Sequence, residues 1–328
     1  MADLTVDLAG VSLRNPLLLA SGLWGETGAS MASAYTAGAG GVVTKSIGAQ
    51  ARPGYPNPTV EPLGPIGLLN AMGLPNPGID EYPAEIEVAR ASGAPVIGSI
   101  FAATPREFAA LARRMASTGV VALELNLSCP HARGYGSEIG SDPRRVERIV
   151  RSVVAAVDLP VLAKITPNTA DPAGLARAAE RGGAHAISAI NTVRALAIDP
   201  TLGRPILAHG LGGLSGPAIK PVGLACVWQI FEAVRIPIVG IGGIGSADDA
   251  LEYLLAGARA VQIGTALSGP GAALFGTIAR DLAARLDALG IDRWGDAVGR
   301  AHAGTPDLSP PPPRPSRGKE VRGQRRRR

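Results

Sequence analysis

Short apolar runs alternate with segments of helical periodicity from the N-terminus to about residue 289. Runs of aliphatic and β-branched residues that stop at Gly or Pro indicate buried strands, and their alternation with helices indicates a parallel sheet. Eight such runs occur, and eight βα units close naturally into a ring, so the sequence predicts an α/β fold, the (β/α)8 TIM barrel. The strands are expected at residues 17–20, 41–44, 95–100, 120–127, 160–165, 184–190, 236–241 and 260–264.

Helices are expected between these strands, and several begin with an Asp-Pro or Thr-Pro pair that suits an N-cap followed by the first helical residue. Two connections, 45–82 and 191–216, are too long to be simple turns. Long ordered loops are usually lids or binding loops, so both are expected over the C-terminal mouth of the barrel. The helices are predicted at residues 105–117, 143–157, 172–181, 247–256 and 272–289.

The charge of the chain is unevenly distributed. The net charge is +5, but the segment 304–328 holds eight basic and two acidic residues, which leaves the rest of the chain close to neutral. A chain of 328 residues with 46% hydrophobic content suits one barrel domain, predicted at residues 1–303. The Pro- and Arg-rich segment 304–328 is expected to be a disordered tail. A barrel without excess positive charge is not expected to bind nucleic acid.

No segment resembles a leader peptide or a membrane span, so a soluble, cytoplasmic protein is expected. The two cysteines, Cys129 and Cys226, are too few for a disulfide framework. They also cannot hold an iron–sulfur cluster through four thiolates. No metal site is expected.

The strand at 120–127 leads directly into reactive residues. Asn126, Ser128 and Cys129 follow its apolar run, and Pro130 stops it. The C-terminal ends of barrel strands build the active site, so a thiol at this position indicates catalysis. From this segment alone, the alternative is that Cys129 is a small buried hydrophobic residue without a catalytic role.

Two glycine-containing turns predict a phosphate site. Gly240-Ile-Gly-Gly-Ile-Gly-Ser246 follows one strand and opens a helix, and Gly264-Thr265 follows the next strand. Glycines let backbone N–H groups approach an anion, and a helix N-terminus adds its positive dipole. The loops after strands seven and eight commonly form the phosphate site of a barrel. Tight turns without a ligand are the alternative.

The chain has only four lysines, Lys45, Lys164, Lys220 and Lys319, among many arginines. Lys45 and Lys164 stand at strand ends, where a compact ammonium group could stabilise a developing anion. Lys220, in the turn at 217–221, is interpreted as structural.

Three amides are expected at the same mouth, namely Asn70, Asn126 and Asn191, with Thr192 beside the last. Amide and hydroxyl groups both donate and accept hydrogen bonds, which suits a flat polar ring bearing carbonyl and N–H groups. The set predicts a small polar substrate beside a phosphate-bearing cofactor.

Five motifs in register carry a resemblance to the class 1 dihydroorotate dehydrogenases, and it extends from about Leu4 to Trp294. The motifs are Asn126-Leu-Ser-Cys-Pro130, Asn70-Ala-Met-Gly-Leu-Pro-Asn-Pro-Gly78, Lys164-Ile-Thr-Pro-Asn168, Ile190-Asn-Thr192 and Gly212-Gly-Leu-Ser-Gly-Pro-Ala-Ile-Lys-Pro221.

The resemblance implies an FMN-containing barrel that oxidises dihydroorotate to orotate in pyrimidine (UMP) biosynthesis. It implies that Cys129 is the base that removes the C5 proton while hydride passes to flavin N5. An ammonium such as Lys164 near the N1–C2=O edge would stabilise the reduced, anionic flavin. The implied substrate contacts are Lys45, Asn70, Ala71, Met72, Gly73, Leu74, Asn126, Asn191 and Thr192. The implied FMN contacts are Ser21, Lys45, Ser46, Ser99, Asn126, Lys164, Ile190, Gly216, Gly242, Gly243, Gly264 and Thr265.

Two positions depart from the family pattern. His131 stands where Asn often follows Ser-Cys-Pro, and Ser99 stands where a flavin-contacting Asn often follows strand three. Either residue could retune the site, because His131 adds a titratable group and Ser99 has a shorter side chain.

Within class 1 the motifs are most similar to class 1B, whose catalytic subunit passes electrons to NAD through a partner subunit with FAD and an iron–sulfur cluster. The resemblance implies a homodimer inside a heterotetramer. One alternative is a class 1A enzyme, which uses fumarate directly as the electron acceptor. Another is the related activity of a dihydropyrimidine dehydrogenase. More distant alternatives are a Schiff-base aldolase through Lys164 and a flavin-free binding protein that uses the Arg-rich tail.

Overall fold

Eight parallel strands form a closed barrel, in the order β10-β15-β16-β3-β4-β7-β8-β9. The computed structural model describes residues 1–127 and 140–304. Each barrel strand lies within its predicted range, so the predicted (β/α)8 fold is confirmed. The strands are β3 (Leu17–Leu19), β4 (Gly41–Val43), β7 (Val96–Ile100), β8 (Ala122–Asn126), β9 (Val161–Lys164), β10 (Ala186–Ala189), β15 (Ile238–Ile241) and β16 (Ala260–Ile263).

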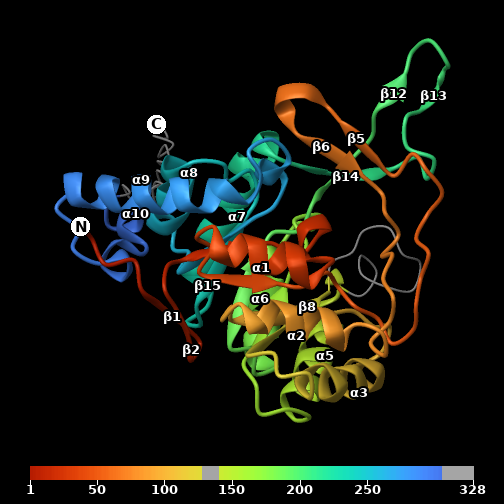
Figure 1. Ribbon diagram of the computed structural model, residues 1–328, viewed down its shortest axis with the longest axis horizontal. Helices are drawn as coiled ribbons and strands as arrows, with labels where there is room; N and C mark the ends of the chain where they lie inside the picture. The colour runs from red at the N-terminus through yellow and green to blue at the C-terminus, as the bar shows by residue number, and fades with distance from the viewer. Residues whose placement is uncertain (128–139, 305–328) are drawn as a thin grey trace, which may run out of the picture.

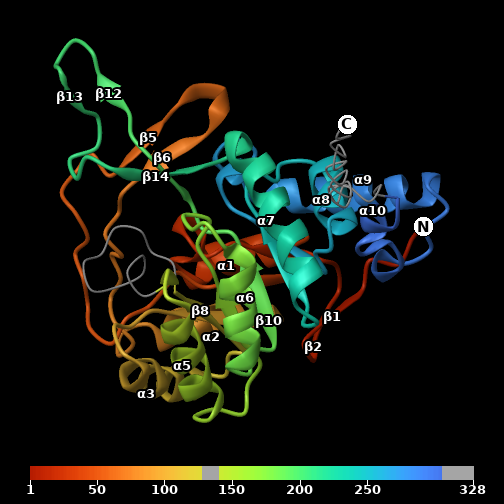
Figure 2. The same cartoon turned by 180° about the vertical axis from the view of Figure 1, so that it is seen from behind.

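Helices follow the barrel strands and pack around the outside of the ring (Figures 1 and 2). The Asp-Pro and Thr-Pro starts behave as predicted, because Thr104, Asp142 and Asp171 each accept a hydrogen bond from a backbone N–H of the first turn. In the described residues the helices are α1 (Gly28–Thr36), α2 (Pro83–Ala91), α3 (Pro105–Ala116), α5 (Pro143–Val154), α6 (Pro172–Arg181), α7 (Lys220–Ala233), α8 (Ala247–Leu255), α9 (Leu274–Ala288) and α10 (Arg300–Ala303).

Four of these helices, α1, α2, α7 and α10, were not predicted from the sequence. Helix α7 begins inside the segment interpreted as a turn and contains a glycine, Gly223, which weakens a helical pattern. Packing explains that glycine, because a Cβ at Gly223 would lie 1.9 Å from the hydroxyl oxygen of Tyr253 on α8. The close approach of the two helices therefore overrides the local propensity.

The two long connections pair with each other in one antiparallel sheet, which we call the flap sheet. It consists of β5 (Val60–Pro62), β6 (Leu68–Asn70), β11 (Val193–Ala195) and β14 (Gly212–Ser215). The hairpin of β12 (Ile198–Asp199) and β13 (Arg204–Pro205) projects from it, away from the barrel (Figure 1). The remaining hairpin, β1 (Val6–Leu8) with β2 (Val11–Leu13), packs its apolar side chains into the main core.

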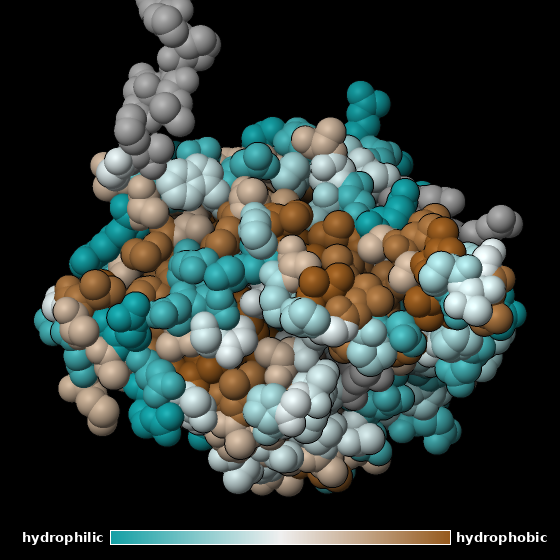
Figure 3. All heavy atoms as spheres, turned by 90° about the horizontal axis from the view of Figure 1, so that it is seen from above, coloured by the Kyte–Doolittle hydropathy of each residue, from teal (hydrophilic) through white to brown (hydrophobic). Residues whose placement is uncertain are grey.

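The surface seen from above in Figure 3 has its apolar side chains in separate patches divided by polar ones. Several exposed apolar residues lie in the segments that form the flap sheet and its hairpin, including Ile198, Leu202 and Leu211. None of the described helices is long and apolar enough to cross a membrane.

Candidate active site

A cavity of about 830 Å³ lies at the C-terminal ends of the barrel strands, between the barrel and the flap sheet. This volume is typical of sites for small molecules and cofactors. The strand ends and the flap segments together supply most residues predicted for the site. Those that line the cavity are Ser21, Lys45, Ser46, Asn70, Met72, Gly73, Leu74, Asn126, Lys164, Ile190, Asn191, Thr192, Gly216, Gly242, Gly243, Gly264 and Thr265.

Two predicted residues lie away from the cavity wall, and two others lie outside the described residues. Ala71 is buried in a small apolar cluster with Leu69 and Leu207. Ser99 is fully buried behind Ser46, with 2.9 Å between the two hydroxyl oxygens. Cys129 and His131 lie in the segment 128–139, which the structure does not describe.

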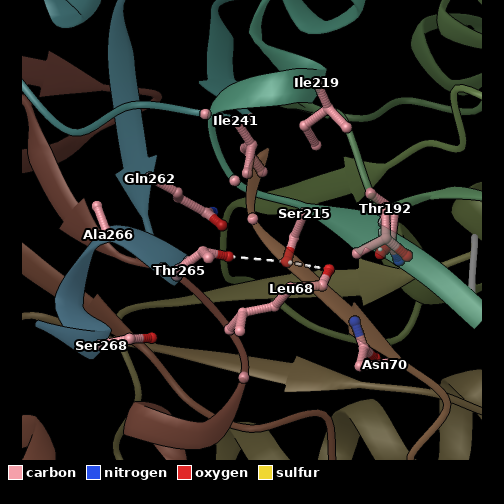
Figure 4. A pocket seen from close by; sticks show the side chains of 18 of the residues that line it. Leu68, Asn70, Thr192, Ser215, Ile219, Ile241, Gln262, Thr265, Ala266 and Ser268 are labelled. Atoms are coloured by element: carbon pink, nitrogen blue, oxygen red, sulfur yellow. Dashed lines mark hydrogen bonds between the residues drawn. The ribbon is translucent and has the colours of Figure 1, made fainter. Parts of the chain in front are cut away.

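Backbone groups form one end of the cavity, which we call the cradle: Gly216, Gly242, Gly243, Gly264 and Thr265. Gly243 has a φ of +69°, and an added Cβ would lie 2.8 Å from the Cβ of Lys220 and 2.9 Å from the carbonyl oxygen of Gly216. Thr265, which follows barrel strand β16, lies close to Ser215 at the end of β14 in the flap sheet, with 2.8 Å between their hydroxyl oxygens (Figure 4). The cradle can therefore bring a bound group close to the main chain, as a phosphate requires.

Side chains take up part of the hydrogen bonding at the N-terminus of helix α8. Ser246 caps the helix by accepting from the backbone N–H of Asp249, and the carboxylate of Asp249 accepts hydrogen bonds from the Ser246 hydroxyl and the backbone N–H of Gly245. Asp249 also lines the cavity. The expectation that this helix end attracts an anion stays a prediction.

Lys220, interpreted from the sequence as structural, lines the cavity but has two carboxylate partners. Its ammonium nitrogen lies 2.7 Å from a carboxylate oxygen of Asp249 and 2.9 Å from one of Glu252. The hydrogen bond to Asp249 leads the effects that raise the pKa of Lys220. Burial alone would raise the pKa of Asp249, but hydrogen bonds from Lys220, Gly245 and Ser246 outweigh it, and the pKa is lowered. The positive charge of Lys220 is thus compensated locally.

Hydroxyl and amide groups form a connected set along the opposite wall. The side-chain N–H of Asn126 donates to the Ser46 hydroxyl at 3.0 Å, and the side-chain N–H of Asn191 donates to the side-chain oxygen of Asn126 at 3.4 Å. Ser21 lies 3.3 Å from Ser46 on the other side. The predicted amides Asn126 and Asn191 therefore meet, and Asn70 reaches the same cavity from β6.

Lys45 presents a buried ammonium group to the cavity. Its nitrogen lies 3.0 Å from a carboxylate oxygen of Glu26, which is half exposed. That nitrogen makes no hydrogen bond of good geometry with any residue of the described ranges 1–127 and 140–304. A buried donor without a well-directed acceptor is costly, so the site suits a ligand that supplies an anionic or carbonyl oxygen.

A charged network lies beneath the cavity, and we call it the floor network: Glu124, Lys164, Ser188 and Gln262. The Lys164 ammonium lies 3.3 Å from one carboxylate oxygen of Glu124, and Ser188 and Gln262 donate to the other at 2.8 and 2.6 Å. Sequence reasoning found only Lys164. A carboxylate in an apolar strand was the available signal for Glu124, because charged residues are almost never fully buried unless they are paired.

The glycines of the cradle, the buried lysine–glutamate pair of the floor and the converging amides line one cavity at the mouth of a (β/α)8 barrel, which is where the enzymes of this fold class have their active sites. The sequence model of the family "Dihydroorotate dehydrogenase" matches residues 3–286. The chain belongs to the dihydroorotate dehydrogenase family, and it is therefore an oxidoreductase. The family resemblance inferred from the five motifs is confirmed.

Curated relatives with the name "Dihydroorotate dehydrogenase B (NAD(+)), catalytic subunit" are similar over most of the chain, and three of them illustrate the likeness. The relative from Methanocella arvoryzae is 50% identical over 80% of this chain and 87% of its own length. The one from Pyrococcus horikoshii is 50% identical over 91% of this chain and 97% of its own. The one from Thermoplasma acidophilum is 46% identical over 92% of this chain and 99% of its own.

Proposed function

We propose that this chain is the catalytic subunit of a class 1B enzyme that oxidises dihydroorotate to orotate with bound FMN in pyrimidine biosynthesis. The observation that carries the proposal is the convergence of the predicted cofactor and substrate residues on one cavity. Relatives named as NAD⁺-dependent catalytic subunits support the subclass. Residues 1–303 would form the catalytic barrel, and residues 304–328 would be a tail without a part in the chemistry.

Two features of the cavity suit FMN. The cradle leaves room for a phosphate beside the main chain, since side chains are absent at Gly216, Gly242 and Gly243. The ammonium groups of Lys45 and Lys164 offer donors to carbonyl or anionic oxygens of the ring. When bound, FMN supplies the acceptor for the hydride that leaves C6 of the substrate.

The remaining lining residues would hold the substrate. Asn70, Asn126, Asn191 and Thr192 offer donors and acceptors to the carbonyl, N–H and carboxylate groups of dihydroorotate. Cys129 would take the C5 proton as general base. Chain connectivity supports this role, because Asn126 ends β8 at the cavity wall and Cys129 follows three residues later.

A partner subunit would carry the electrons onward to NAD⁺. The chain has two cysteines in all, which cannot supply a four-thiolate cluster, so FAD and the iron–sulfur cluster would belong to the partner. We propose a homodimer of this chain within a heterotetramer. Fumarate as the direct acceptor, which class 1A enzymes use, is the alternative that the test must separate.

The test is spectroscopic. We expect the purified full chain, loaded with FMN, to be yellow and to bleach when dihydroorotate is added without oxygen. Rapid reoxidation by fumarate would indicate class 1A, whereas a need for the partner subunit before NAD⁺ is reduced would indicate class 1B. Bleaching by dihydrouracil in place of dihydroorotate would support a dihydropyrimidine dehydrogenase. A chain that binds no FMN would overturn the proposal and return attention to Lys164 as a reactive amine.

A further inference from the structure

The carboxylate of Glu124 joins four strands inside the barrel. Glu124 lies on β8 and is fully buried. One of its oxygens faces the Lys164 ammonium on β9 at 3.3 Å. The other accepts hydrogen bonds from Ser188 on β10 at 2.8 Å and from the Gln262 amide on β16 at 2.6 Å. Donors from three other strands therefore fix this side chain in one place.

Glu124 does not line the cavity, so it acts on a ligand there through Lys164 and Gln262. Lys164 and Gln262 line the cavity, whereas Glu124 does not. The Gln262 amide is held at both ends, because its N–H donates to Glu124 while its oxygen lies 3.5 Å from the Lys164 nitrogen. In Figure 4 the Gln262 side chain points from β16 into the space shared with Thr265 and Ser215. The network thus ends in two groups that face a ligand.

The hydrogens of the Lys164 ammonium are only partly used by the protein. An ammonium carries three N–H donors. Glu124 and Gln262 take two of them, and the third has no partner among the described residues. The carboxylate and its neighbour hold the nitrogen at a fixed point of the floor, and one donor is left for the cavity.

The carboxylate also offsets the charge of Lys164. A negative charge 3.3 Å below the ammonium weakens the positive field that the cavity experiences, and this effect is large where water is excluded. The floor therefore acts on a ligand as a held ion pair rather than as an isolated cation. The electrostatic energy of a more negatively charged ligand would therefore depend on both Lys164 and Glu124.

We propose that Glu124 is a positioning residue that holds and partly neutralises Lys164, and so sets how strongly the site favours reduced, anionic FMN over the oxidised form. The inference rests on the proposed function only in taking FMN as the bound group. It assigns to Glu124 no contact with FMN or with the substrate.

The test is the midpoint potential of FMN bound to the full chain, measured by equilibration with redox dyes. In Glu124→Gln the ammonium loses its counter-charge, so we expect the ratio of affinities for reduced and oxidised FMN to rise at least tenfold, about 30 mV upward for a two-electron couple. Ser188→Ala removes a hydrogen bond to the same carboxylate and keeps both charges. We expect it to change that ratio by less than threefold.

An unchanged or lower potential in Glu124→Gln would overturn the inference and leave Glu124 as a purely structural residue. If that variant does not fold, Glu124→Asp keeps the charge but draws the ammonium away from the cavity. We expect its affinity for FMN to fall at least tenfold, and unchanged affinity and potential would overturn the inference.

The potential is measured without dihydroorotate, so this test is separate from the proposed reaction. A wild-type chain that binds FMN and is not reduced by dihydroorotate contradicts the proposed function alone. A wild-type chain that binds no FMN overturns both.

Discussion

The floor network and the cradle line the same cavity, and each offers hydrogen-bond donors to a bound anion by different means. The floor supplies charge through side chains, and Glu124, Ser188 and Gln262 hold the Lys164 ammonium in place. The cradle supplies space and main chain, and the nearest lysine, Lys220, has its charge taken up by two carboxylates. We infer that substitutions which change charge have their largest effects at the floor network, and that substitutions which add side-chain volume have their largest effects at the cradle.

The largest expected effect is on stability at the floor. Lys164→Met leaves the Glu124 carboxylate buried without its counter-charge, and removing one partner of a buried pair costs about 3–5 kcal/mol. Urea unfolding would measure this loss. The double variant Lys164→Met/Glu124→Met removes both charges and should recover most of it. A single variant that loses under ~1 kcal/mol would show that the pair does not matter for folding.

A glycine-to-alanine substitution should weaken FMN binding at Gly243, which belongs to the cradle, much more than at Gly245, which lies two residues beyond it. Gly243→Ala places a Cβ within 2.9 Å of the Gly216 carbonyl oxygen at a φ of +69°, so the loop must shift. At Gly245 the nearest atom to a Cβ lies 3.4 Å away, an ordinary contact. We expect FMN affinity, measured by fluorescence titration, to fall tenfold or more in Gly243→Ala and less than threefold in Gly245→Ala. Equal losses would contradict the sensitivity to volume.

Lys220→Met should lower stability by about 1 kcal/mol at pH 7. It should also weaken FMN binding, though less than Gly243→Ala does, because it leaves the Asp249 carboxylate at the cavity wall without its counter-charge. The pKa of Asp249 is lowered in the folded chain, so its contribution exists above its unfolded pKa of about 4 and is lost as the pH falls through the folded value. The pKa of Lys220 is raised, so its contribution is lost only as the pH rises above its ordinary value.

Thermal unfolding as a function of pH would test this pair. The deficit of Lys220→Met relative to wild type should persist from about pH 5 to 9 and shrink towards pH 3. A deficit that stays constant down to pH 3, or a loss of FMN affinity larger than that of Gly243→Ala, would contradict the account of the cradle.

The smallest effect is expected at Cys226, which lies in α7 outside both regions. Burial raises the pKa of this thiol to about 11. Native protein treated with iodoacetamide at pH 8 should therefore keep Cys226 unmodified, as judged by peptide mass spectrometry against a denatured control. Labelling of Cys226 to the same extent in both samples would be the contradicting result. In Cys226→Ala, dihydroorotate should bleach the bound flavin at nearly the wild-type rate, which makes thiol labelling a specific probe of Cys129.

Much of the fold was predictable because its signals are local. Barrel strands such as β3 and β4 are buried on both faces and therefore form continuous apolar runs. Capping residues such as Asp171 mark helix starts. The helix α7 was missed because Gly223 is explained only by its contact with Tyr253, which the sequence cannot show.

The candidate site divides in the same way. The cradle follows from glycines placed after two strands, and the paired amides follow from motifs. The floor does not, because Glu124 and Gln262 are 138 positions apart and meet only when the barrel closes. Ser99 likewise has its place behind Ser46 set by the packing of β7 beside β4, which no motif reports.

The most direct test of the account is the rate at which dihydroorotate bleaches bound FMN in Cys129→Ala, followed by stopped-flow absorbance at pH 7 without oxygen. General base catalysis contributes about 10²–10⁴-fold, so we predict that the variant binds FMN normally and is reduced at least ~100-fold more slowly than wild type. Bleaching at nearly the wild-type rate would remove Cys129 from the role of base, and no bleaching of the wild type would contradict the proposed reaction itself.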